Sequence, residues 1–173
     1  MQSVKSSSAT GASSMPSAAE LRAGDDLLLR PWRESDAGAV GVGPGDEGEV
    51  GRYFGLPIGG AWPEPDPAAP WFAIVENGVP VGRIWFAWHK RPFEVGYFLR
   101  PDAWGRGLAT RSLVLVCAWM REQGEETIEL CTHPRNERSQ AVAKRAGFRP
   151  VGTIERYAEF RDGETTALRF LWP

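Results

Sequence analysis

The segment from Arg100 to Thr110, RPDAWGRGLAT, places two closely spaced glycines and two arginines directly before an apolar run that predicts a helix. A helix start presents unpaired N–H groups and a partial positive charge. Glycines at 105 and 107 let the backbone approach an anion, and Arg100 and Arg106 add formal positive charge. The pattern predicts a site for a phosphate or pyrophosphate group, as found in nucleotide cofactors.

The loop alone does not identify the cofactor. Leu108-Ala109 stands where a nucleotide triphosphatase would carry lysine followed by serine or threonine. The three-glycine dinucleotide fingerprint is also missing. From this loop by itself, a glycine-containing connection without any ligand is the alternative.

A second polar pair follows a predicted buried strand, Thr127 to Thr132. Asn136 stands where a helix N-cap belongs, and Gly147 where a left-handed residue ends the same helix. Asn136 and Ser139 are three residues apart, so both can point to one side of the first turn. Helix capping explains both residues unless the neighbouring motifs indicate a ligand.

These segments must be positioned by two strand–loop–helix units, the first starting with the strand Glu94 to Leu99. In this order, WGRGLA, N-x-x-S and AGF at 146–148 resemble the GNAT superfamily of acyl-CoA-dependent N-acetyltransferases. More narrowly, they resemble its Rim-type branch, which acetylates N-terminal amines of ribosomal proteins and includes small-molecule acetyltransferases.

The resemblance extends from about Leu27 to Trp172. LLLRPWRESDA is similar to the first strand and helix entry of that branch, PGDEGEVGRYFGLP to its second helix and turn, and WFAIVENGVPVGRIWF to a hairpin turning at Asn77-Gly78. It implies an α+β (mixed α/β) fold with a central mixed, mostly antiparallel twisted sheet. The sheet is expected to splay between its two parallel middle strands, the first of them bulged, with helices on both faces.

Length and composition agree with one domain. The chain has 173 residues, enough for a core of its own. Residues 1–24, rich in serine and alanine, predict a flexible leader, and residues 25–173 a single acetyltransferase domain.

The family resemblance implies acetyl-CoA as the acyl donor. Backbone groups of Phe98, Leu99 and Arg100 would pair with the pantetheine arm, and an N–H near Phe98–Leu99 would stabilise the oxyanion. The pyrophosphate would be held by amides of Gly105, Arg106, Gly107, Ala109 and Thr110. The thiol end of the cofactor would meet Asn136 and Ser139.

The proton chemistry is also implied by the family. Many relatives use a tyrosine as general acid at the position where this chain has Ala143, so that version is expected to be excluded and Ser139 or water to serve the departing thiolate. For the general base the resemblance implies Glu159. Glu155 is expected on the same strand face by the period-two rule, and Glu94 is the next candidate, acting through water.

No metal is expected. His133 has no second histidine or cysteine at a metal-ligand spacing, and His89 lies in a predicted hairpin end.

The family resemblance predicts direct acetyl transfer, in a ternary complex, to a primary amine of a small molecule or of a protein N-terminus. The alternative is a non-catalytic acyl-CoA-binding module on the same scaffold.

An acidic group precedes the central hairpin and would favour a cationic acceptor if it lines the amine site. It comprises Asp46, Glu47, Glu49, Glu64 and Asp66.

Charge and hydropathy limit the partners. The formal net charge is −2, which gives no general nucleic-acid footprint. The longest apolar run, Leu113 to Met120, is far short of the roughly 20 residues of a membrane helix.

Cys117 and Cys131 fit packed thiols in a reducing compartment, so a cytoplasmic protein is expected. The expected oligomeric state is a monomer or a homodimer.

Overall fold

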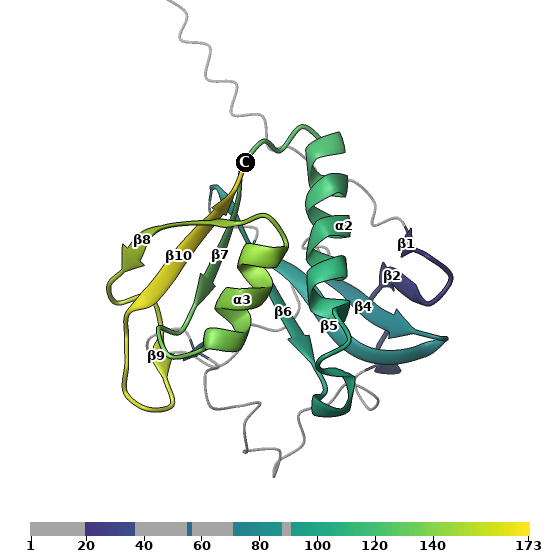
Figure 1. Ribbon diagram of the computed structural model, residues 1–173, viewed down its shortest axis with the longest axis horizontal. Helices are drawn as coiled ribbons and strands as arrows, with labels where there is room; N and C mark the ends of the chain where they lie inside the picture. Colours follow the sequence, from purple (N-terminus) through teal and green to yellow (C-terminus); the bar gives the residue numbers. More distant parts are fainter. Residues whose placement is uncertain (1–19, 37–54, 57–70, 88–90) are drawn as a thin grey trace, which may run out of the picture.

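The computed structural model describes residues 20–36, 55–56, 71–87 and 91–173 (Figure 1). Their main sheet has the strand order β1-β2-β4-β5-β6-β7-β10-β8, and β3 pairs with β9 separately. The strands are β1 (Leu21–Ala23), β2 (Leu27–Pro31), β3 (Gly55–Leu56), β4 (Trp71–Glu76), β5 (Val79–Ala87), β6 (Phe93–Leu99), β7 (Ile128–Thr132), β8 (Arg149–Ile154), β9 (Glu159–Phe160) and β10 (Ala167–Trp172). The described helices are the short 3-10 helix η1 (Pro101–Ala103), α2 (Leu108–Glu122) and α3 (Glu137–Arg145).

The β4–β5 hairpin turns at Asn77-Gly78, as predicted. Asn77 has φ 48° and Gly78 has φ 82°. Two positive φ angles match the right-handed twist of the flanking strands, which is why this dipeptide favours a tight hairpin.

The sheet opens between β6 and β7, its parallel pair (Figure 1). The two strands pair only at Phe93 with Ile128 and at Glu94 with Glu129. Beyond these positions β6 remains on β5 as far as Leu99, whereas β7 remains on β10. The predicted splay is therefore confirmed. The expected bulge is not seen against β5, because the β5–β6 register runs without a shift; the strands simply diverge.

Both α2 and α3 lie on one face of the sheet (Figure 1). Side chains at alternate positions of β6, from Phe93 to Leu99, share the core with the apolar side of α2. On α2 this side includes Leu113, Val116 and Met120, which are at most 1% exposed. Each such buried side chain contributes about 1.5–3 kcal/mol, so the core fixes the helix against the opening of the sheet.

Helices on the opposite face were also expected. The stretches that would form them, within 37–54 and 57–70, lie outside the described residues. Of the expected second helix and turn at 44–57, the structure describes Gly55–Leu56, which form strand β3. None of the described helices is long and apolar enough to cross a membrane.

Two boundaries differ from expectation. Leu21 to Ala23 form β1 and pair with β2, so the predicted leader of residues 1–24 extends too far and the domain includes residues 21–24. A strand of three residues has almost no periodicity, so the sequence alone does not predict β1. Glu155 lies in a turn after β8, whereas Glu159 begins β9, so the two glutamates do not share one strand face.

Candidate functional site

The glycine loop ends in an uncapped helix. Gly105 and Gly107 have φ 77° and 74°, a left-handed conformation that side chains other than glycine adopt only with strain. Gly107 is the N-cap of α2 and has no side chain to satisfy the first N–H groups. A Cβ at either glycine would meet no atom of the protein within 4 Å. The loop thus presents its backbone to open space, as an anion-binding loop requires.

One hydroxyl and two arginines surround this loop. Within the described part of the chain, Thr110 Oγ1 is buried and has no hydrogen-bond partner. Arg106 pairs with Glu76 at 2.6 Å and donates to the carbonyl of Asp102. Arg100 donates to the carboxylate of Asp102 from two nitrogens. Both arginines lie beside the loop as predicted, but each already has an acidic partner.

Backbone groups in the opening belong to alternate residues of β6. The N–H of Arg100 donates to the carbonyl of Val81 on β5 at 2.9 Å. By the antiparallel alternation, Phe98 also pairs toward β5, whereas Tyr97 and Leu99 direct their backbone groups toward the splay. Among the three residues predicted to pair with pantetheine, Leu99 has this orientation, whereas the backbone groups of Phe98 and Arg100 are directed toward β5. Tyr97, which was not predicted, faces the splay together with Leu99.

Trp104 closes one side of this opening. Its indole N–H donates to the carbonyl of Leu99 at 2.9 Å. Its ring lies under the Arg138 guanidinium of α3, 5.0 Å from the ring centroid. The glycine loop, the end of β6 and the start of α3 are thus joined, and the Leu99 carbonyl is occupied while its N–H points into the splay.

Asn136 and Ser139 come together as predicted. The Asn136 side chain accepts a hydrogen bond from the Ser139 N–H at 3.1 Å and caps α3. On the other side, the Tyr97 hydroxyl donates to Ser139 Oγ at 3.1 Å. Because Tyr97 supplies the proton of this bond, the hydroxyl hydrogen of Ser139 can point to another acceptor.

Tyr97 was not predicted from the sequence, where the expectation was that the tyrosine-acid arrangement is excluded and that Ser139 or water serves the departing thiolate. The expectation rested on Ala143, the position on α3 where relatives carry the tyrosine. The structure instead brings a tyrosine to Ser139 from β6. Burial raises the pKa of Tyr97 to about 12, so this hydroxyl stays protonated at ordinary pH. The N-x-x-S pattern indicated only residues close in sequence and could not reveal a partner 42 residues away.

Two buried carboxylates lie where β6 and β7 separate, on the face of the sheet opposite α2 and α3. Glu94 and Glu129 are paired positions of the two parallel strands and are 9% and 3% exposed. Glu94 accepts a hydrogen bond from the Tyr157 hydroxyl, and Glu129 accepts one from Arg169. Burial raises the pKa of Tyr157, so it remains a donor.

Ligand atoms of Glu94, Glu129 and Cys131 lie within 4.8 Å of one another. Three such donors can suggest a metal. Here both carboxylates already accept hydrogen bonds from protein side chains, and the thiol of Cys131 lies 3.7 Å from Glu129. The arrangement is therefore satisfied by the protein itself.

Glu159, the predicted base, occupies a different environment. It begins β9, pairs with Leu56 of β3 and is exposed. Glu94 lies at the point where β6 and β7 separate. Of the glutamates considered from the sequence, Glu94 is the one that the structure places at the opening.

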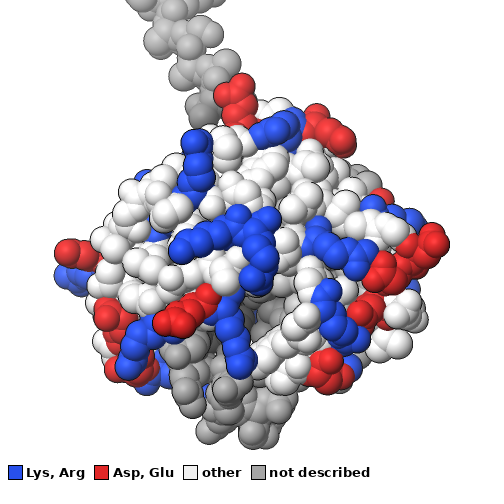
Figure 2. All heavy atoms as spheres, in the orientation of Figure 1, with Lys and Arg blue, Asp and Glu red and all other residues white. Residues whose placement is uncertain are grey.

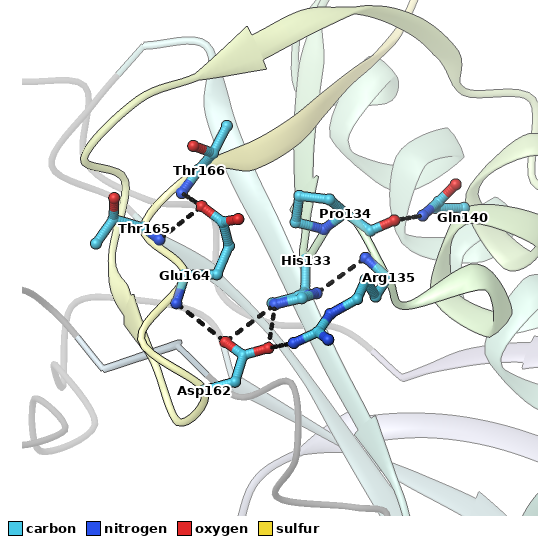
Figure 3. Close-up of polar contacts among 8 residues, drawn as sticks. All are labelled: His133, Pro134, Arg135, Gln140, Asp162, Glu164, Thr165 and Thr166. Carbon is cyan, nitrogen blue, oxygen red and sulfur yellow. Dashed lines mark hydrogen bonds and ion pairs between the residues drawn. The ribbon is translucent and has the colours of Figure 1, made fainter.

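His133 precedes α3 and contacts Asp162 in the segment between β9 and β10 (Figure 3). Its Nδ1 accepts from the backbone N–H of Arg135 at 2.9 Å, and its Nε2 lies 3.0 Å from the Asp162 carboxylate. The backbone N–H of Glu164, together with Arg135 and His133, lowers the pKa of Asp162 to about 2. Both ring nitrogens thus have protein partners, which indicates a positioning role. His89 lies outside the described residues, as does the acidic group of residues 46–66.

The face formed by α2 and α3 is basic near its centre. Figure 2 shows Lys and Arg side chains gathered there, while most acidic side chains lie nearer the rim. α2 carries Arg111 and Arg121, and α3 carries Arg138, Lys144 and Arg145; of these, Arg111 is paired with Asp26. Such a surface favours an anionic ligand lying across it.

The comparisons with known proteins agree with this geometry. The family model of the acetyltransferase (GNAT) domain matches residues 26–149. No curated protein matches the sequence.

Several solved structures share the fold. RimJ of Mycobacterium smegmatis in complex with CoA-disulfide is 22% identical, with 89% of this chain and 85% of that chain covered and a TM-score of 0.71. The ribosomal-protein-S5-alanine acetyltransferase of Vibrio fischeri is 18% identical, with 87% and 94% covered and a TM-score of 0.69. The microcin C7 self-immunity acetyltransferase MccE, in complex with acetyl-CoA and AMP, is 14% identical, with 85% and 92% covered and a TM-score of 0.69.

Proposed function

Because the chain belongs to the acetyltransferase (GNAT) family, we propose that it transfers the acetyl group of acetyl-CoA directly to a primary amine in a ternary complex. The observation that carries the proposal is the opening between β6 and β7 beside the uncapped start of α2. A cofactor can place its anionic end on that helix and its acyl end in the opening.

The loop and helix residues would hold the cofactor's phosphates. Backbone N–H groups from Gly105 to Thr110 lie at the positive end of α2, with the unpaired Thr110 hydroxyl beside them. The glycines at 105 and 107 leave space for the anion. The basic face of α2 and α3 supports this placement through charge complementarity.

The reaction forms a C–N bond and breaks the C–S bond of the thioester. The Leu99 N–H, directed into the splay, is the proposed donor to the carbonyl oxygen as it gains negative charge. The thiolate that leaves would accept the Ser139 hydroxyl hydrogen. Tyr97 supports this step because its own proton already occupies one lone pair of Ser139 Oγ.

The amine must lose a proton to complete the transfer. We propose Glu94 as the group that accepts it, through water, because it lies at the separation point of β6 and β7. Tyr157 holds its carboxylate in place. Glu159, favoured by the family resemblance, remains the competing candidate. The reaction as proposed uses no metal ion.

The acceptor is proposed to be a small-molecule amine or a protein N-terminus. The structural neighbours include a ribosomal L7/L12 α-N-protein acetyltransferase, which supports a protein N-terminus, and a microcin C7 self-immunity acetyltransferase. If the acidic residues between Asp46 and Asp66 line the amine site, the acceptor KM should rise with salt while the acetyl-CoA KM changes less. A salt-independent acceptor KM would remove this idea.

The test is free-thiol release from acetyl-CoA against aminoglycosides, polyamines, amino acids and short N-terminal peptides. Turnover with any amine establishes catalysis and the acceptor class. Acetyl-CoA binding without turnover of any amine would favour the non-catalytic acyl-CoA-binding module. Absence of acetyl-CoA binding, measured by calorimetry, would contradict both.

A further inference from the structure

Two tryptophans and an arginine form a platform on β4 and β5. The Trp71 and Trp85 rings are stacked, with centroids 5.7 Å apart and planes inclined by 24°. The Arg83 guanidinium carbon lies 5.1 Å from one ring centroid and 5.2 Å from the other. Cation–π contacts of this kind hold a guanidinium in a fixed position.

This platform lies on the same face of the sheet as Glu94. Trp71, Trp85 and Gly96 are consecutive partners across β4, β5 and β6. A Cβ at Gly96 would come within 2.4 Å of the Trp85 ring, so the indole lies directly over this glycine. Glu94 is two residues from Gly96 and shares its face by the period-two rule. The platform therefore extends to the acceptor side of the splay, opposite α2 and α3.

Arg83 lacks the acidic partner that other buried or half-buried arginines of this protein have. Arg30 pairs with Asp36 at 2.7 Å, Arg111 with Asp26 at 2.6 Å, and Arg169 with Glu129. Arg83 Nε is buried without a hydrogen-bond partner, and within the described part of the chain no carboxylate forms an ion pair with this guanidinium. Burial also lowers the pKa of Arg83.

A half-buried guanidinium without a counter-ion costs free energy, because burial disfavours an unpaired charge. The tryptophans compensate this cost in part. An anion would compensate it further by pairing with the guanidinium, whose fork of N–H groups suits carboxylate and phosphate.

We propose that Arg83, held by Trp71 and Trp85, binds an anionic group of the acceptor, a carboxylate or a phosphate. The proposal rests on the acetyl-transfer function above and narrows its acceptor to an amine that also carries an anion. Arg83 pairs in register with Phe98, four residues from Glu94 on β6. The two backbones are thus roughly 13 Å apart at about 3.3 Å per residue, a span that one acceptor of short-peptide size can cover.

The experiment compares three peptides with the same N-terminal amine. They are Ala-Ala-Ala amide, which is neutral at its far end, Ala-Ala-Ala with a free carboxylate, and Ala-Ala-phosphoserine amide. The anion lies far from the amine, so the amine pKa is nearly the same in all three. Thiol release gives kcat/KM for the wild type, Arg83→Gln and Arg83→Lys, with Arg22→Gln as the control at an exposed arginine of β1.

The wild type should prefer at least one anionic peptide over the neutral one by tenfold or more. Arg83→Gln should abolish the preference and leave the neutral peptide unchanged, Arg83→Lys should retain part of it, and Arg22→Gln should behave as the wild type. Which anionic peptide is preferred distinguishes carboxylate from phosphate. If no peptide turns over, the same comparison is made by calorimetry on the CoA-loaded protein.

Equal loss for all three peptides in Arg83→Gln would overturn the proposal, since it would indicate a structural role. So would the absence of any anion preference in the wild type, in turnover or in binding. Acetyl-CoA binding by the wild type is measured alongside. If the wild type does not bind acetyl-CoA, the acetyl-transfer function itself is refuted. If it binds acetyl-CoA normally but Arg83→Gln does not change the preference among the peptides, only the anion site is refuted.

Discussion

The Tyr97 hydroxyl donates to Ser139 Oγ across 3.1 Å and thereby joins β6 to the first turn of α3. Tyr97 lies on β6, and Ser139 lies on α3, the helix that follows β7 in the chain. Asn136 fixes Ser139 from the other side through the backbone N–H. Ser139 is thus held at two points, and its hydroxyl hydrogen is left for a third partner.

Tyr97→Phe should lower kcat with little change in the acetyl-CoA KM. A lost hydrogen bond is worth about 0.5–1.5 kcal/mol, so the expected decrease is roughly two- to tenfold. Ser139→Ala should cost more, and the double variant should cost no more than Ser139→Ala alone, because Tyr97 acts through Ser139. Steady-state thiol release measures all three.

The leaving group provides a control for this interpretation. If Ser139 and Tyr97 serve the thiolate, the defect of both variants should shrink with an acetyl thioester of a more acidic thiol. A defect of equal size with acetyl-CoA and with the second thioester would indicate that Tyr97 and Ser139 only support the fold.

The raised pKa of Tyr97 has its own test. Burial raises the value to about 12, so the neutral form is favoured in the folded protein. Its contribution to stability is complete below the ordinary tyrosine pKa near 10 and is lost as pH rises through about 12. In a phenolate absorbance titration, wild type minus Tyr97→Phe should show no step near pH 10. A step at that pH would contradict the burial of this hydroxyl.

Gly107→Ala should raise the acetyl-CoA KM and Kd. Alanine at φ 74° is strained by about 1–2 kcal/mol, and its methyl group would occupy the space through which the loop meets an anion. Gly124→Ala is the matched control, since Gly124 has φ 89°, open space around a Cβ, and a position at the far end of α2. Both variants should lose similar stability in urea, but only Gly107→Ala should lose acetyl-CoA affinity. Equal affinities would remove the loop from the cofactor site.

Glu94→Gln should flatten the acidic limb of the kcat/KM pH profile and lower the rate at neutral pH by about 10²-fold or more. Glu159→Gln should retain both the limb and most of the rate, because Glu159 is exposed on β9. The reverse result would return the role of base to Glu159. Thermal unfolding of Glu94→Gln shows whether the buried hydrogen bond from Tyr157 is also needed for stability.

Asp162→Asn should destabilise the protein at neutral pH and not at very low pH. The pKa of Asp162 is lowered to about 2 by the Glu164 N–H, Arg135 and His133. A lowered carboxyl pKa contributes stability above the ordinary value near 4, and this contribution is lost as pH falls through about 2. Urea midpoints of the wild type and variant should therefore differ at pH 5 and converge between pH 4 and 2. Parallel curves over that range would contradict the assignment.

The sequence predicted most of what is local or repeated in a strand or helix. The Asn77-Gly78 turn, the Asn136 cap and the left-handed Gly147 follow from the backbone preferences of those residues. The splay and the order of the elements followed from the family resemblance. The acetyltransferase (GNAT) family itself was confirmed by the family model.

What was missed depends on residues distant in the chain. Tyr97 reaches Ser139 only because β6 passes beside α3, and Arg83 gains its environment only when β4 and β5 bring Trp71 and Trp85 together. The backbone groups that face the opening depend on hydrogen-bond alternation against β5, which one strand's sequence does not encode. In each case the environment of the residue is set by contacts between elements that are distant in the chain, and not by the type of residue.

The short β6–β7 pairing divides the main sheet into two half-sheets, β1-β2-β4-β5-β6 and β7-β10-β8, which are joined at Phe93 with Ile128 and at Glu94 with Glu129. The proposed reaction groups are shared between them, with Leu99 and Tyr97 on one and Ser139 anchored to the other. A ligand lying in the opening would contact both half-sheets and link them. Its binding free energy would then oppose their separation, so acetyl-CoA should slow amide exchange in β10 as well as in the loop that it touches.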